Sequence, residues 1–525
     1  MSTTAKRHDN IPSAFRAVAR TRGDQPVMLG AALDWTFAVL DRASDGVAAS
    51  LAGRGIVPGD RIGLYCPNAP EFAVAYLGIL KVGATVVPIN LMLNPKEIAF
   101  ILEDAGAKAF FYHAALAAAS DQARELLPEL GFAVRIGGGE GADPMLDTLV
   151  ASTDAPPALE FDPARHLAAI LYTSGTTGRP KGAMLSHANL MANTASVMQA
   201  LRLEPGRDRI LVVLPMFHAF AATVGMLAPL LHGLALVIVD RFDPKLVSAA
   251  IAAHGATVFL GVPSMYGLLL RLDDETLSQW ASVRFCVSGG AAMPQAVMAA
   301  FEKRFGVPVL EGDGPTECSP VTCVNSLSGP RKPGSVGLSI PQVEMRIADP
   351  DGNWLADGEH GEVCVRGPNV MQGYWGLDEE TRKSFFGDWF RTGDLGCRDT
   401  DGYFFLVDRI KDLIIVNGMN VYPRMIEEVL YRHPDVAEAA VVGEPHRLHG
   451  EIPVAFVVPK ADADADPGRL RDWCKENLGR HEIPRRVELR ESLPRNAAGK
   501  ILKRELRRQG ELERGVENDP DALHT

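Results

Sequence analysis

The most constraining feature of the sequence is a loop rich in glycine and hydroxyl residues, which begins at Thr173 and ends at Lys181. Its residues are Thr173, Ser174, Gly175, Thr176, Thr177, Gly178, Arg179, Pro180 and Lys181. Backbone amides, hydroxyls and a lysine at this density suit a bound polyphosphate. A Walker A loop needs Gly-Lys-Ser/Thr at its end, whereas Gly182 follows Lys181 here. A kinase or GTPase of that class is therefore disfavoured.

The segments on either side of this loop indicate an α/β fold. Leu167–Tyr172 is predicted to be a buried strand that enters the loop, and Asn189–Met198 is predicted to be a helix after it. Glycine-rich loops between a strand and a helix are typical nucleotide sites in α/β proteins. A flexible linker is the alternative for such a composition, and the flanking pattern disfavours it.

The hydrophobic pattern changes twice along the chain. Strand and helix patterns alternate from about residue 36 to residue 305, which predicts parallel sheets covered by helices. Shorter strands follow from about residue 334, and the hairpin signals Asp349–Gly352 and Asp399–Gly402 predict a β-rich subdomain. The segment after Asp412 has the pattern of a compact α+β unit, whose polar end over 507–525 is expected to be disordered.

Composition and charge exclude several classes of protein. A chain of 525 residues is too long for a single core, and 47% hydrophobic with 22% charged residues is ordinary for a globular enzyme. The net charge of −12 argues against nucleic acid as a partner, because phosphate neutralisation requires clustered Lys and Arg. No apolar run approaches the ~20 residues of a membrane span, and the first residues lack the apolar core of a signal peptide. We therefore expect a cytoplasmic protein without a span, with peripheral membrane contact left open.

Two further segments carry residue types that suit nucleotide chemistry. Thr316 and Glu317 follow a glycine turn, where a hydroxyl can contact phosphate and a carboxylate can bind a hard cation. The same residues also make a good helix start with Thr316 as the cap. Asp394 is predicted to end a strand, where it would bind ribose hydroxyls, or else to be an ordinary turn aspartate.

Two more segments supply positive charge. Arg409 and Lys411 lie close to Gly418, and a surface salt-bridge cluster is the simpler interpretation of that segment alone. Lys500 lies on a glycine-containing loop before a basic helix, where a lone lysine is usually solvated. Neither segment indicates a site by itself.

The order and spacing of these five segments resemble the acyl-adenylate-forming superfamily, which holds acyl-CoA synthetases, amino-acid adenylation domains and firefly luciferase. The resemblance extends from about residue 12 to residue 508 and is nearest to medium- and long-chain fatty-acid CoA ligases. It implies an α/β N-terminal domain over 1–408, made of two parallel-type αβα subdomains and the β-rich subdomain at 334–408. It also implies a hinge at 409–411 and a small mobile α+β domain over 412–525.

The resemblance implies ATP, Mg²⁺ and coenzyme A as ligands and a small-molecule carboxylic acid as substrate. The acid attacks the α-phosphorus of ATP to give acyl-AMP and pyrophosphate, and the thiol of CoA then displaces AMP. Positioning and charge neutralisation dominate such phosphoryl chemistry. A homodimer is left open by the sequence.

The resemblance also implies roles for individual residues. The loop Thr173–Lys181 would wrap the β- and γ-phosphates, Glu317 would hold Mg²⁺ together with Thr173, and Thr316 would contact the α-phosphate. Asp394 and Arg409 match ribose ligands. The walls around adenine match Gly289, Gly290, Ala291, Gly312, Asp313 and Gly314.

Three implied roles concern the second domain and the adenine site. Lys500 matches the lysine that bridges the substrate carboxylate and the α-phosphate, Lys411 matches the hinge, and the loop around Gly418 would line the pantetheine tunnel. Many members of the superfamily have an aromatic residue at position 313, where this chain has Asp313. Stacking on adenine must then come from elsewhere, or Asp313 accepts a hydrogen bond from the adenine amino group.

The segment Phe217–Phe220 bears on the choice of acid. It lacks the aspartate with which amino-acid-activating relatives pair the substrate ammonium, and an unpaired buried ammonium is costly. By resemblance, His218 is a gate residue near the substrate carboxylate, although a lone histidine is usually a core residue. Small residues at Ala221, Ala222 and Gly225 predict room for an extended apolar tail. A fatty acid is therefore favoured over an aryl acid, and a ligase that loads a carrier protein is a further alternative.

Overall fold

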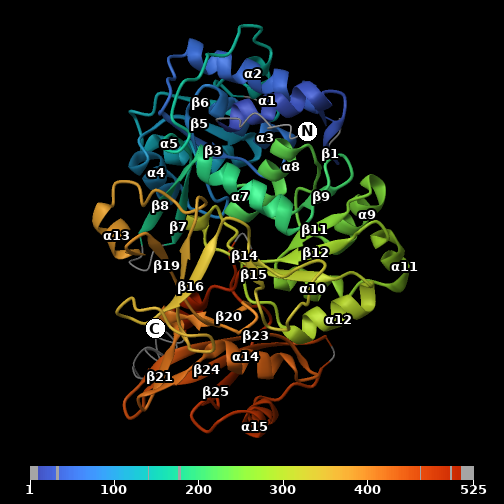
Figure 1. The fold of residues 1–525 in the computed structure, drawn as a ribbon, viewed down its shortest axis with the longest axis vertical. Coiled ribbons are helices and arrows are strands. Elements are labelled where there is room, and N and C mark those ends of the chain that lie inside the picture. Colours follow the sequence, from blue (N-terminus) through green and yellow to red (C-terminus); the bar gives the residue numbers. More distant parts are fainter. Residues whose placement is uncertain are drawn as a thin grey trace, which may run out of the picture.

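Two bodies of unequal size make up the protein. A computed structural model describes residues 10–30, 35–139, 141–174, 179–461, 463–496 and 499–509. Figure 1 shows a large body that holds roughly the first three quarters of the chain and a smaller α+β body beneath it. No helix in the described ranges has both the length and the apolar character needed to cross a bilayer.

The large body contains two mainly parallel sheets, as the alternating pattern predicts. Each has antiparallel strands only at an edge. The six-stranded sheet has the order β6 (Phe132–Ile136), β5 (Ala107–His113), β3 (Arg61–Tyr65), β4 (Thr85–Pro88), β7 (Leu167–Ser174), β8 (Pro180–Ser186). The nine-stranded sheet has the order β15 (Leu338–Ser339), β14 (Cys323–Val324), β13 (Val309–Asp313), β12 (Phe285–Ser288), β11 (Val258–Gly261), β9 (Arg209–Val212), β10 (Ala235–Ile238), β1 (Pro26–Leu29), β2 (Trp35–Thr36).

Helices and short helical turns accompany these two sheets. The α-helices of the large body are α1 (Ile11–Arg22), α2 (Phe37–Gly53), α3 (Pro70–Lys81), α4 (Pro95–Asp104), α5 (Ala117–Glu125), α6 (Leu146–Val150), α7 (His187–Ala200), α8 (Ala228–His232), α9 (Pro244–His254), α10 (Pro263–Leu269), α11 (Asp274–Leu277), α12 (Gln295–Phe305) and α13 (Asp378–Lys383). A π-helical segment, η2 (Ala221–Leu227), precedes α8, and the 3₁₀ turns are η1 (Ala114–Leu116), η3 (Ser278–Trp280), η4 (Thr316–Cys318) and η5 (Ile410–Asp412).

The phosphate-loop segment differs from the expected strand–loop–helix arrangement. Strand β8 follows the loop and runs antiparallel to β7, so that the loop connects two paired strands and α7 begins only at His187. The helix predicted over Asn189–Met198 is confirmed as α7, whereas the strand β8 between the loop and this helix was not predicted. The pairing satisfies the backbone along the edge of β7. It also places Thr173 opposite Lys181.

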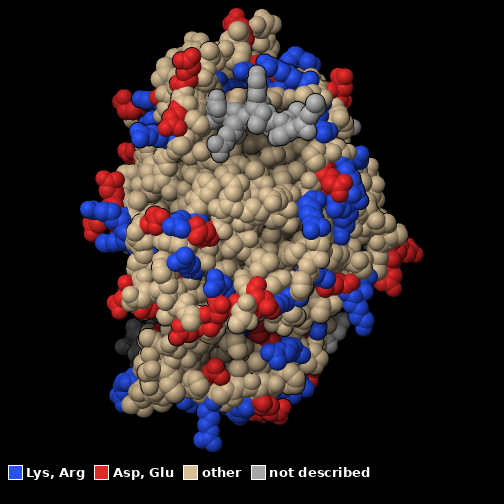
Figure 2. Space-filling view, in the orientation of Figure 1, with Lys and Arg blue, Asp and Glu red and all other residues tan. Residues whose placement is uncertain are grey.

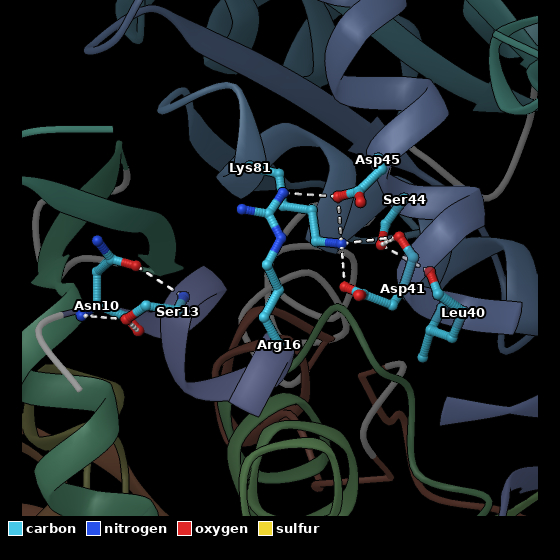
Figure 3. Close-up of polar contacts among 8 residues, drawn as sticks. All are labelled: Asn10, Ser13, Arg16, Leu40, Asp41, Ser44, Asp45 and Lys81. Atoms are coloured by element: carbon cyan, nitrogen blue, oxygen red, sulfur yellow. Dashed lines mark hydrogen bonds and ion pairs between the residues drawn. The ribbon is translucent and has the colours of Figure 1, made fainter. Parts of the chain in front are cut away.

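A buried ionic group joins the first three helices (Figure 3). The Lys81 ammonium, at the end of α3, donates to the Asp41 carboxylate at 2.5 Å and to the Asp45 carboxylate at 2.7 Å. Arg16 of α1 binds the same Asp45 at 2.7 Å. Burial lowers the pKa of Lys81, and the two carboxylates oppose that shift. The group holds α1 and α3 against α2, and each of its four side chains is ion-paired with another member of the group.

The β-rich subdomain and the smaller body complete the fold. The subdomain is an antiparallel sheet of β16 (Glu344–Ala348), β17 (Gly361–Arg366), β19 (Trp389–Arg398), β18 (Phe385–Phe386) and β20 (Phe404–Arg409). The smaller body has hydrophobic clusters of its own. Its elements are β21 (Ile414–Val416), β22 (Met419–Val421), α14 (Pro423–Tyr431), β23 (Val436–His446), β24 (Gly450–Pro459), α15 (Pro467–Asn477) and β25 (Arg486–Leu489). Residues 510–525 of the tail lie outside the described ranges.

Candidate functional site

The hairpin β7–β8 places the phosphate-loop residues beside Glu317. The Thr173 hydroxyl donates to Oε1 of Glu317 at 3.5 Å, and the Tyr374 hydroxyl donates to the same oxygen at 2.9 Å. The Lys181 ammonium forms an ion pair with Glu380 of α13 and lies 5.4 Å from the centre of the Tyr374 ring. Two segments more than 140 residues apart in sequence thus form one polar corner.

The structure describes only part of the predicted phosphate loop. Gly175, Thr176, Thr177 and Gly178 lie outside the described residues, and of Ser174 only the backbone is described. Their assignment to the phosphates stays a prediction. Thr173 and Lys181, at the two ends of the loop, are the members whose places are known.

Strands β19 and β20 bring Asp394 and Arg409 together. The two residues are register partners, and Nη1 of Arg409 donates to Oδ1 of Asp394 at 2.7 Å. Asp394 is buried, and its carboxylate raises the pKa of Arg409, whereas burial of the guanidinium opposes that rise. The strand does not end at Asp394 as predicted but continues to Arg398, with a register shift directly after Leu395. A second register shift, in the pairing of β19 with β17, lies between Glu362 and Cys364, so that Asp394 lies in an irregular stretch of the ladder.

A pocket of about 590 Å³ lies between α7, η2 and the ends of β12 and β13. Its mouth includes His218, Asp313 and Thr316. The remaining lining carries no charged side chain and comprises Val197, Ala200, Leu201, Phe220, Val224, Val287, Ser288, Gly289, Gly290, Gly312, Gly314, Pro320, Val321, Val324 and Ile340. The pocket therefore suits an apolar group attached to a polar head.

The predicted source of room in this pocket was wrong. Ala221, Ala222 and Gly225 belong to η2 but do not line the pocket. A side chain at Gly225 would meet Val212 of β9 at 3.1 Å, so this glycine allows close packing on the sheet. The pocket is instead bounded by α7, whose contribution the sequence did not suggest.

Asp313 and His218 have ionisation states set mainly by burial. Burial raises the pKa of Asp313 to about 6, the Asp394 carboxylate adds to the rise, and Arg409 and Lys500 oppose it. Burial lowers the pKa of His218 to about 4, and the Lys500 ammonium lowers it further. At neutral pH Asp313 is therefore mainly a hydrogen-bond acceptor, and His218 is uncharged.

Lys500 reaches this site from the smaller body. Desolvation by the surrounding protein lowers the pKa of Lys500. The positive charges of Arg409 and Lys411 lower this pKa further, whereas the carboxylates of Asp394 and Asp313 oppose the shift. The preceding Gly499 approaches Val262 of the large body, where a Cβ atom would lie 2.9 Å from the valine side chain. Among the described residues the Lys500 ammonium forms no ion pair.

Three other predicted positions do not line the pocket. Lys411 is exposed in η5, directly after β20. Gly418 lies with Asn417 at the tip of the β21–β22 hairpin, both with positive φ, as an Asn-Gly turn requires. A side chain at Gly418 would have no neighbour within 4 Å, whereas Asn417 bonds to His449 within the smaller body. Ala291, expected at the adenine, follows Gly290 but does not line the pocket.

Several polar residues of the site had no signal in the sequence. Tyr374 and Glu380 contact Glu317 and Lys181. Thr316 begins η4 after Pro315, and its side chain does not cap that turn, which removes the capping alternative. These contacts join segments that are far apart in sequence, and no local sequence pattern predicts them.

The chain is similar in sequence and in fold to known enzymes. The AMP-binding enzyme family matches residues 15–375, and the AMP-binding enzyme C-terminal domain matches residues 425–500. A long-chain-fatty-acid–CoA ligase of Salmonella typhimurium is 34% identical over 531 residues, covering 95% of this chain and 94% of the relative. A feruloyl-CoA synthase of Amycolatopsis sp. is 36% identical over 478 residues, covering 90% and 94%. The crystal structure of the anthranilate CoA ligase AuaEII with anthranoyl-AMP superposes with a TM-score of 0.91 at 27% identity, covering 98% and 100%.

Proposed function

The chain belongs to the AMP-binding enzymes and is an AMP-forming acid–thiol ligase, and from that premise we propose that it joins a medium- or long-chain fatty acid to CoA. The observation that carries the proposal is the position of Lys500. The charges of Asp313, Asp394 and Arg409 act on its ammonium. The adjacent Gly499 packs against Val262 of the large body, beside a pocket with a largely apolar lining. An ammonium at that place would stabilise charge on an α-phosphate and a substrate carboxylate.

The nucleotide would be held by residues of five elements. Asp394 and Arg409 would bind the ribose, and Asp313 would accept from the adenine amino group at the end of β13. Thr316, at the pocket mouth, would contact the α-phosphate. Lys181 would exchange Glu380 for the β- and γ-phosphates, because a triphosphate offers more negative charge than one carboxylate.

The described residues fit a magnesium ion carried in with ATP. Mg²⁺ usually keeps several waters and takes one or two carboxylates together with substrate phosphates. Glu317 supplies one carboxylate and Thr173 one hydroxyl, and no cluster of three or more His, Cys, Asp or Glu is present in the described part of the chain. Such an ion would neutralise phosphate charge, while Tyr374 would orient the Glu317 carboxylate through its hydrogen bond.

Replacing Asp394 by asparagine tests the ribose assignment. We expect KM for ATP to rise roughly tenfold or more with a smaller change in kcat, since a charge-assisted acceptor contributes on the order of 1.5–3 kcal/mol. Steady-state kinetics with ATP varied would measure this. Asp399→Asn, at the turn after β19, is the control. An unchanged KM for ATP in the Asp394 variant would remove this residue from the nucleotide site.

The uncharged pocket supports a fatty acid as the substrate. Helix α7, which provides Val197 and Ala200 and is followed by Leu201, lies where Figure 2 shows a broad face without charged side chains. Each buried methylene contributes ~0.8 kcal/mol, so a longer acyl chain should bind more tightly in a pocket of this kind. The feruloyl-CoA synthase and the anthranilate CoA ligase favour an aryl acid as the second candidate.

A screen of acids distinguishes the two candidates. We would measure pyrophosphate release with CoA present for acids from acetate to oleate and for benzoate- and cinnamate-type acids. The proposal expects kcat/KM to rise with aliphatic chain length, whereas a maximum at the aryl acids would establish the second candidate. AMP release with a carrier protein but not with CoA would indicate the carrier-loading alternative.

A variant of α7 tests whether the pocket holds the acyl tail. Ala200→Phe should lower kcat/KM for the longest accepted acid roughly tenfold, the equivalent of one or two excluded methylenes at ~0.8 kcal/mol each. Short acids should be affected less. Ala195→Phe, on the exposed side of the same helix, is the matched control. Equal losses for acids of every length would show that the tail lies elsewhere.

A further inference from the structure

Glu311 is a buried carboxylate that the proposed mechanism does not use. It lies on β13, two residues before Asp313, and is 1% exposed. Its Oε1 accepts a hydrogen bond from the amide of Met293 at 2.9 Å, whereas Oε2 is buried without a partner among the described residues. Burial raises the pKa of Glu311 to about 7, the charges of Glu428 and Asp313 add to the rise, and Arg424 opposes it. Such a group is costly unless a cation accompanies it.

The cation that accompanies Glu311 comes from the smaller body. Arg424 is near the start of α14, and its Nη2 lies 3.9 Å from Oε1 of Glu311. Its Nη1 donates to the carbonyl of Leu406 at 2.6 Å, and its amide donates to Asp408 at 3.0 Å. Leu406 and Asp408 belong to β20, the strand that leads into η5. Arg424 therefore binds the large body at two places, β13 and β20.

Helix α14 connects this contact to the segment that carries Lys500. One turn after Arg424, the Glu427 carboxylate binds the ammonium of Lys503 at 2.8 Å, three residues after Lys500. The next residue, Glu428, accepts a hydrogen bond from the backbone of Gln295. Burial raises the pKa of Glu428, and this hydrogen bond opposes the rise. Gln295 begins α12, and its N-cap, Pro294, supplies no side-chain cap. One helix thus touches β13, β20 and α12 of the large body and also holds the Lys500 segment.

We propose that Glu311 and Arg424 are positioning residues, whose contact holds the smaller body in the orientation that brings Lys500 to the nucleotide site. The proposal rests on the role given above to Lys500. A contact that exists in one orientation only shifts the balance between orientations by its own free energy. Loss of the contact should therefore slow the first half-reaction, which needs Lys500, and spare the second.

The test measures the two half-reactions separately. Acid-dependent exchange of pyrophosphate into ATP reports the first, and conversion of synthetic acyl-AMP and CoA to acyl-CoA reports the second. We expect Arg424→Met to lower kcat of the first roughly tenfold, within the usual range of coupling between sites, and to leave the second unchanged or faster. Arg424→Lys should restore most of the loss, because it keeps a cation near Glu311. Glu311→Gln should reproduce the loss, and the double variant should be no worse than Arg424→Met.

Two controls separate this effect from general damage. Arg469→Met removes an arginine that binds Asp464 within the smaller body, and it should leave both half-reactions unchanged. Equal loss of both half-reactions in Arg424→Met, or no loss in either, would overturn the positioning role. So would additive effects in the double variant.

The proposed function can fail independently of this inference. If the wild-type protein shows no acid-dependent exchange, or if Lys500→Ala retains it, the proposed function is wrong. If Lys500→Ala abolishes exchange while Arg424→Met does not slow it, only the positioning role is wrong.

Discussion

Lys500→Ala should abolish acid-dependent pyrophosphate exchange while synthetic acyl-AMP is still converted to acyl-CoA. The Lys500 ammonium lies near Asp313, Asp394 and Arg409 without an ion pair among the described residues, and it is the charge brought to this place by the smaller body. Removal of one preorganised donor to a transition-state oxyanion typically costs about 3 kcal/mol, or a factor of 10²–10³ in kcat. Exchange kinetics and a thioester assay on the same preparation would measure the two halves.

The control for this variant is an exposed lysine of the same body. Lys475 lies in α15 and pairs with Asp472, so that Lys475→Ala should change neither half-reaction. An equal loss of both halves in Lys500→Ala would contradict the assignment, because a residue needed only for adenylation cannot limit the attack of the thiol.

Lys411→Pro is expected to have the opposite effect, with acyl-AMP still formed and acyl-CoA lost. Lys411 is exposed in the short turn between β20 and β21, where a large change in backbone dihedral angles would reorient the smaller body. Proline fixes φ near −65° and restricts the preceding residue as well. In a rapid-quench experiment acyl-AMP should accumulate to about one equivalent per enzyme, with thioester formation reduced at least about 100-fold.

Lys411→Ala separates the backbone effect from loss of the side chain. It removes the amine and keeps the freedom of φ, so it should form acyl-CoA close to the wild-type rate. Normal overall turnover in Lys411→Pro would show that the second half-reaction does not need a change at this position.

The parts of the site that could be predicted from sequence are those encoded locally. The strand at Leu167 and the turns at Asp349 and Asp399 follow from short patterns, and the structure contains each of them. The helix predicted over Asn189–Met198 is present as α7, but strand β8 before it was missed, because pairing of Pro180–Ser186 with β7 is a tertiary property that periodicity does not reveal.

Contacts between distant segments were the part that sequence could not supply. Tyr374 meets Glu317 across 57 residues, and Glu380 meets Lys181 across 199 residues. The pocket residues of α7 were missed because their side of the helix differs little in polarity from the other. Gly225 was assigned to the pocket on its size alone, whereas its neighbours show that it packs on the sheet.

A distance between the two bodies in solution tests the central claim most directly. Fluorescent labels at the exposed residues Lys96 of α4 and Glu476 of α15 would report the orientation of the smaller body. With ATP and acid we expect one distance, and with an acyl-AMP analogue and CoA a second distance that Lys411→Pro does not reach. A single distance under all of these conditions would contradict the account, because Lys500 would then stay at the nucleotide site throughout both half-reactions.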